Sequence, residues 1–263
     1  VSSRWPQKPF NFDELSFYSG RGNITVGSFA VADTVFRDTK VDFENTVGEL
    51  VINSFSGKLS DGRIDAEGTI GIALPTINAT FKGVNLDAEE VLDKLFGFNR
   101  VKGKFSASGS INMSGFTLHQ WITSLQGGIN FVSRDITLDS FDLLLLSRKL
   151  PRLKNIKETR YWSHKALSGG QTRINYVTGA MTLTDGVGVI ERTSLDHPLI
   201  KSSYFLATVD FVQWLVNSKA VFQVTVPLGW VPVRVTVDGD IDRPLIFWDK
   251  KDIENYWARN FYR

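Results

Sequence analysis

The sequence contains no cysteine, which excludes disulfide bonds, thiolate metal ligands and thiol nucleophiles. Its three histidines, His119, His164 and His197, lie far apart along the chain, and none belongs to an HxH or HExxH pattern. No run of apolar residues approaches the roughly 20 that a membrane-spanning helix needs. We therefore expect no metal ion, no other cofactor and no membrane span within this chain.

An excess of charge of one sign is also missing. The 263 residues include 30 Lys and Arg against 28 Asp and Glu, a formal net charge of +2. Such a balance gives no long-range field that would attract DNA or RNA, so we expect no nucleic-acid partner. Hydrophobic residues make up 42% of the chain and charged residues 22%, which is typical of a folded protein with a sizeable core. The chain begins at Val1 rather than Met, so we expect any targeting signal or membrane anchor to have been removed or to lie outside it.

What the sequence has in abundance is the alternation of apolar and polar residues with a period of two. Ile77, Ala79 and Phe81, for example, each stand between polar neighbours. This pattern indicates strands with one apolar and one wet face, as in antiparallel sheets. Because crossover helices between the strands are missing, a parallel α/β fold is disfavoured. The predicted strands cover residues 22–31, 39–44, 47–55, 63–70, 77–82, 104–113, 128–133, 135–139, 173–184, 186–192, 203–211, 219–227 and 232–241.

Helical patterns interrupt the strands at three places. Asp87 and Glu90 form a capping-box-like start for a helix that ends near Gly97, and two further helices are predicted over 118–125 and 140–147. Short helices of this kind can cover the edge or the end of a sheet. The predicted fold class is therefore mainly β, with a few short covering helices. We expect one antiparallel β domain over residues 1–247 with a basic helical insert at about 140–170, and an aromatic and basic C-terminal helix or tail over 248–263.

The insert carries the one local anomaly of charge. Six basic residues and only Glu158 as a counter-charge give the window 148–160 a net charge of +5. Together with the apolar run Leu143–Leu146, the window is typical of an amphipathic surface segment that contacts anionic head groups or a protein partner, although an exposed loop fits the same residues. The candidate contact residues are Arg148, Lys149, Arg152, Lys154, Lys157 and Arg160.

The order of several short motifs is more specific than any one of them. The run Gly48–Ile52 is followed by Asp61-Gly62, and the glycine-punctuated strand Val101–Phe105 is followed by a short helix that ends at Ser124–Gly128. A further strand then leads to Phe141-Asp142-Leu143, and the last strand closes at 237–244 with a glycine and a proline. This order resembles the C-terminal region of the AsmA-like proteins, which are related to TamB and to the bridge-like lipid transfer proteins. The resemblance covers most of residues 10–247 but not the basic insert or the aromatic tail.

The resemblance implies a long curved antiparallel sheet whose concave apolar face forms a groove for lipid acyl chains. It further implies a periplasmic location, with an inner-membrane anchor outside this chain, and a non-enzymatic role in moving phospholipids between the inner and outer membranes or in outer-membrane homeostasis. The alternation alone fits an open groove and a filled, sandwich-like core equally well. The candidate groove residues are Val41, Phe43, Ile64, Ile70, Ile77, Phe81, Phe105, Ile111, Met113 and Phe131.

A second hypothesis belongs to another class of function. An exposed edge of the predicted sheet could pair with a strand of a partner protein. On this interpretation the chain is a structural or interaction module that assists outer-membrane protein assembly through sheet-edge contacts.

Overall fold

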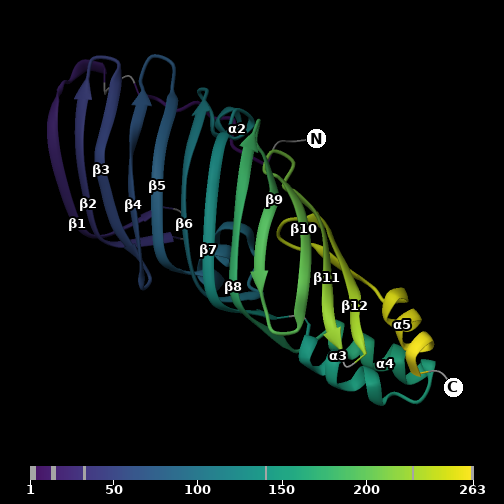
Figure 1. Ribbon diagram of the computed structural model, residues 1–263. Coiled ribbons are helices and arrows are strands. Elements are labelled where there is room, and N and C mark those ends of the chain that lie inside the picture. The colour runs from purple at the N-terminus through teal and green to yellow at the C-terminus, as the bar shows by residue number, and fades with distance from the viewer. Residues whose placement is uncertain (1–3, 13–15, 32–33, 140, 227, 262–263) are drawn as a thin grey trace.

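The computed structural model describes residues 4–12, 16–31, 34–139, 141–226 and 228–261. They form one antiparallel sheet of thirteen strands that lie side by side in chain order (Figure 1). The two outer strands, β1 and β13, each pair with a single neighbour among the described residues, so the sheet is open. The predicted fold class is therefore confirmed. The strands are β1 (Gly20–Val31), β2 (Thr34–Thr46), β3 (Glu49–Leu59), β4 (Gly62–Gly71), β5 (Thr76–Asp87), β6 (Val101–Ser114), β7 (Gln126–Asp139), β8 (Gln171–Thr184), β9 (Val187–Asp196), β10 (Ile200–Asp210), β11 (Leu215–Val226), β12 (Gly229–Asp240) and β13 (Leu245–Asp249).

The helices lie in the connections between strands and after the last strand. Figure 1 shows α3, α4 and α5 gathered beside one end of β11 and β12. Among the described residues, no helix is long and apolar enough to cross a membrane. The helices are α1 (Ala88–Phe96), α2 (Leu118–Thr123), α3 (Leu143–Lys149), the 3-10 helix η2 (Leu150–Arg152), α4 (Ile156–Leu167) and α5 (Lys251–Phe261).

Two differences from the predicted elements have a clear physical reason. The strands expected at 128–133 and 135–139 are one strand, β7, in which Asp135 adopts a left-handed φ of 55°. A residue inserted in this way breaks the period of two and imitates a strand boundary in the sequence. The aromatic tail, in turn, begins as strand β13 and becomes helical only at Lys251, because Trp248 continues the sheet by pairing with Val235.

The hydrophobic core lies where the helices meet the sheet. α3 packs on β11, α5 packs on β12, and α4 lies across α3 and α5. Trp257 and Ile253 of α5 are buried in the core between the helices and the sheet. The Trp257 indole Nε1 donates a hydrogen bond to the Leu153 carbonyl over 3.2 Å. The sheet residues covered by the helices include Ala220, Phe222, Val224, Val226, Val231 and Val233.

Candidate functional site: a long apolar face of the sheet

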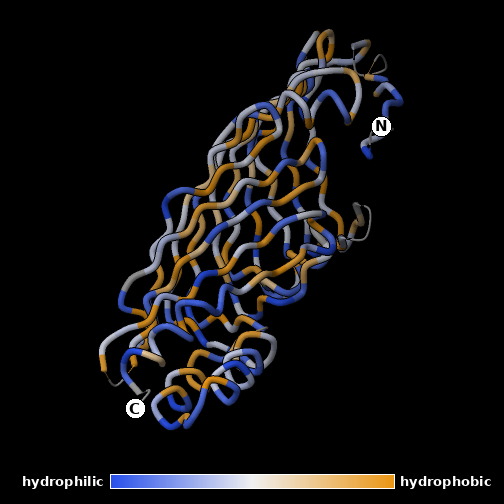
Figure 2. Tube along the Cα trace, turned by 90° about the vertical axis from the view of Figure 1, so that its right-hand side faces the viewer, coloured by the Kyte–Doolittle hydropathy of each residue, from blue (hydrophilic) through white to orange (hydrophobic). Residues whose placement is uncertain are grey.

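All ten candidate groove residues lie on one face of the sheet. In antiparallel strands, directly paired residues project to the same side. Ile77 pairs with both Ile70 and Met113, and the other candidates follow the same register from β2 to β7. Figure 2 shows the corresponding alternation of hydrophobic and hydrophilic residues along the strands. The face that the sequence predicts therefore exists as a continuous surface.

These ten side chains are half-buried: none is fully enclosed and none stands free in solvent. They shield one another along the sheet, yet water reaches every one of them. The same face continues through paired residues into β11 and β12, where Val224 and Val233 are 0% exposed beneath the helices. One apolar face is thus a closed core beneath the helices, whereas its side chains at the ten candidate positions from β2 to β7 remain partly accessible to solvent.

Glycines allow the large side chains to lie flat on this face. A Cβ atom on Gly22 would come within 2.6 Å of the Phe43 ring, which occupies the space above the glycine of the neighbouring strand. Gly179 and the Phe131 ring are arranged in the same way. An aromatic ring that covers a neighbouring glycine buries part of its area without rising from the sheet. The face therefore has low relief.

A shallow depression of about 610 Å³ follows one row of paired residues across β3 to β7. The row contains small residues on three of its strands, Gly68, Ala79 and Gly127. Ile52 and Ile111 complete the row and, with neighbouring residues of β3 to β7, line the depression.

An aromatic cluster near the β1 edge is not among the residues that the sequence predicts for the apolar face. The rings of Phe29 and Phe36 stack with centroids 5.3 Å apart, and both lie within 6.4 Å of the Phe55 ring. These residues do not follow the alternation with a period of two, because the strands are irregular beside them. Asp38 has a left-handed φ of 49°, and the register of β3 and β4 shifts between Ile52 and Phe55. Their signal in the sequence is the aromatic residue type rather than its spacing.

The six basic candidates lie on the helical insert, which covers the closed end of the apolar face, and not on the sheet itself. Arg148, Arg152, Lys154 and Lys157 are exposed, and Arg160 is exposed but forms an ion pair with Glu254 of α5 over 3.0 Å. Lys149 is half-buried, with its Nζ atom 4.1 Å from the centre of the Trp162 ring. The segment is helical on both sides of η2, so the alternative of an exposed loop applies only to the short connection around Lys154.

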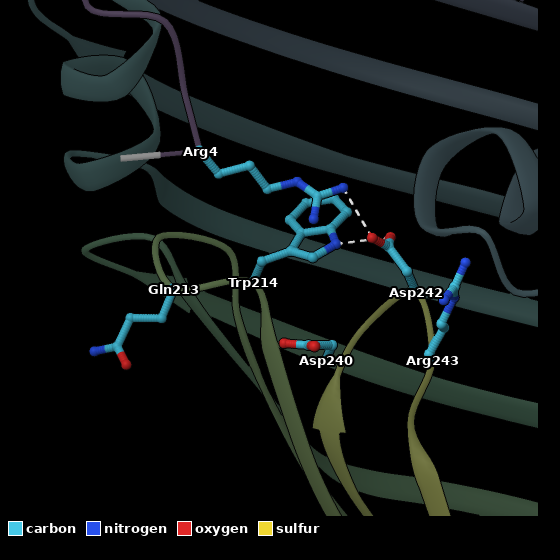
Figure 3. A pocket seen from close by; sticks show the side chains of 6 residues that line it. All are labelled: Arg4, Gln213, Trp214, Asp240, Asp242 and Arg243. Carbon is cyan, nitrogen blue, oxygen red and sulfur yellow. Dashed lines mark hydrogen bonds and ion pairs between the residues drawn. The ribbon is translucent and has the colours of Figure 1, made fainter. Parts of the chain in front are cut away.

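A polar clasp joins the N-terminal residues to the turns at one end of β10 to β13. Arg4 donates a hydrogen bond to Asp242 over 2.9 Å, and the Trp214 indole Nε1 donates one to the same carboxylate over 2.8 Å (Figure 3). The hydrogen bond from Trp214 and then that from Arg4 lower the pKa of Asp242. The guanidinium carbon of Arg4 also lies over the Trp214 ring, 4.5 Å from its centre. The Trp5 ring meets the Trp214 ring edge-on, with the two ring centres 5.4 Å apart.

The clasp borders an open cavity of about 500 Å³ that Gln213, Asp240 and Arg243 also line. Figure 3 shows Arg4 and Trp214 converging on Asp242, whereas Gln213 points away from them. Because the charged groups at its centre satisfy one another, the arrangement holds the turns together rather than presenting reactive groups. Within the described parts of the chain, no group of three or more His, Asp or Glu side chains is placed to hold a metal ion.

Comparison of the chain with models of known protein families, with curated proteins and with solved structures gives no match. The function is therefore inferred from the geometry of the apolar face and from the order of motifs in the sequence.

Proposed function

We propose that this chain is a non-enzymatic lipid-binding module of the AsmA-like type, located in the periplasm as part of a protein anchored in the inner membrane. Its apolar face holds phospholipid acyl chains and supports lipid transport between the inner and outer membranes. The observation that carries the proposal is the continuous apolar face over β2 to β7, on which every candidate side chain remains accessible to water.

The physical reason is the cost of leaving such a surface wet. Burying apolar area is favourable by about 25 cal/mol per Å², and each acyl methylene that leaves water contributes about 0.8 kcal/mol. A chain lying along the face gains this energy at each strand, and the low relief produced by the Phe131 ring over Gly179 presents no large barrier between neighbouring positions. Movement along the face then needs neither a nucleotide nor a metal ion.

The test is the lipid that the protein carries when it is purified from a lipid-containing membrane extract. We expect native mass spectrometry to detect bound phospholipid on the wild type. Phe81→Glu places a carboxylate on the apolar face and should reduce the loading strongly, because that charge must be desolvated by each acyl chain that passes. Ser108→Glu is the matched control, since Ser108 is exposed on the opposite face, where it pairs with Lys82. Lipid-free wild-type protein, or equal loss in both variants, would overturn the proposal.

A specific observation also favours the sheet-edge function as a second candidate. β1 is a twelve-residue edge strand with Arg21 as its one charged residue, whereas β13, at the other edge, has five residues and follows Pro244. Long edges with few charges readily accept another strand. If assistance to outer-membrane protein assembly depends on this edge, Thr25→Pro should abolish capture of an outer-membrane barrel component and leave lipid loading intact. Unchanged capture would exclude the edge.

A further inference from the structure

The helices that cover β11 and β12 carry uncompensated positive charge on their outer side. Arg148, Arg152, Lys154 and Lys157 are exposed, and the described residues provide no acidic partner for any of them. Glu158, the one acidic residue in this window, is engaged at the start of its own helix, where it accepts hydrogen bonds from the Lys154 backbone amide and the Asn155 side chain. It does not neutralise the four cations.

Exposed apolar side chains stand among these cations. On α4, Lys157, Tyr161 and Lys165 are spaced by four residues and therefore share one helix face. Tyr161 is 59% exposed, and Leu144, which shares a face of α3 with Arg148, is 46% exposed. The opposite faces of α3 and α4 contribute buried residues to the core, which holds both helices against the rest of the protein.

The geometry points to a docking surface for an anionic phospholipid bilayer, formed by α3, η2 and the outer face of α4. The cations are spread over α3, η2, α4 and the connection before α4, and they line neither of the two cavities described above, which suits mobile head groups better than one fixed ligand. Tyr161 and Leu144 are placed to enter the boundary between head groups and acyl chains. The inference deepens the proposed function, because docking brings the closed end of the apolar face to a membrane.

The experiment is co-sedimentation with vesicles of pure phosphatidylcholine or of an equimolar mixture of phosphatidylcholine and phosphatidylglycerol. We expect binding to the mixed vesicles only, and its loss in 1 M salt, where the screening length falls to about 3 Å. Each basic residue near an anionic surface changes the partition coefficient about fivefold, so the triple variant Arg148→Gln, Arg152→Gln, Lys157→Gln should bind roughly 100-fold more weakly.

The control carries the same loss of charge on the polar face of the sheet. Lys40→Gln, Lys82→Gln, Arg192→Gln changes three exposed residues on strands β2, β5 and β9, outside α3, η2 and α4, and should leave vesicle binding unchanged. Equal weakening by both triple variants, or no binding of the wild type to anionic vesicles, would overturn the inference, even if the surface captured an acidic protein instead.

Lipid loading, measured on the same samples, separates this inference from the proposed function. Retained loading without vesicle binding would refute the docking surface alone. Vesicle binding without any loaded lipid would refute the apolar face as a lipid site and leave the docking surface standing.

Discussion

The open apolar face predicts that equal truncations of aromatic residues have unequal costs along the sheet. Phe222 lies on the covered part, 8% exposed and stacked on Phe141 with centroids 6.3 Å apart. Phe222→Ala leaves a cavity that the helices enclose, so it should lower the free energy of unfolding by about 3–5 kcal/mol. Phe131 lies on the accessible part of the same face and is only half-buried.

For Phe131→Ala the cavity term is absent, because water fills the space that the ring leaves. What remains is the transfer free energy of the buried fraction of the ring, about 1–2 kcal/mol. The assay is urea denaturation followed by far-UV circular dichroism, on protein from which lipid has been extracted so that no ligand covers the ring. A cost for Phe131→Ala equal to that for Phe222→Ala would refute the reasoning, because it would mean that the face is a filled core over its whole length.

Two further predictions concern the sheet and one of its turns. A Cβ atom on Gly109 would collide with the Gly128 carbonyl oxygen, so Gly109→Ala should destabilise the protein by about 1–3 kcal/mol in thermal denaturation. Gly128→Ala is the control and should be close to neutral, because the nearest neighbour of its Cβ atom would lie 3.8 Å away. Equal effects of the two substitutions would contradict the crowding at Gly109. Burial lowers the pKa of His197 below its ordinary value of 6.5 despite the opposing charge of Asp196, and its Nδ1 accepts a hydrogen bond from the Leu199 amide over 3.0 Å. The neutral imidazole is therefore the form that the fold favours, so its contribution to stability is complete above pH 6.5 and is lost as the pH falls through the folded-state pKa. His197→Asn keeps an acceptor that does not titrate and should remove this part of the pH dependence, which unfolding curves on either side of pH 6.5 would measure; an unchanged pH profile would exclude His197 as its source.

The sequence predicts the strands and the apolar face well for a local reason. Alternation is a property of neighbouring residues, so it places Ile77 and Phe81 on one face of their strand, and Ile111 and Met113 on one face of theirs, before any pairing is known. It fails where a single residue is inserted, as at Asp38 and Asp135, because every side chain beyond the insertion changes face. The aromatic cluster of Phe29, Phe36 and Phe55 is hidden for this reason.

Other features depend on contacts between distant parts of the chain, which a single sequence does not encode in any local pattern. The clasp joins Arg4 to Asp242 across 238 positions, and Trp257 reaches Leu153 across 104 positions. For the same reason, the division of one apolar face into a covered end and an accessible length follows from where α3, α4 and α5 pack. In the sequence, β5 on the accessible part of the face and β11 beneath the helices both show this alternation.

The most direct test of the central claim is photo-crosslinking from the face itself. Because the chain contains no cysteine, Ala79→Cys gives a unique thiol on the apolar face, and Ser108→Cys gives one on the polar face nearby. Each variant is labelled with a benzophenone maleimide, incubated with phospholipid, irradiated and analysed by intact-protein mass spectrometry. We predict a phospholipid adduct for Ala79→Cys and none for Ser108→Cys. No adduct at either position, or equal adducts at both, would contradict the account of an apolar face that holds acyl chains.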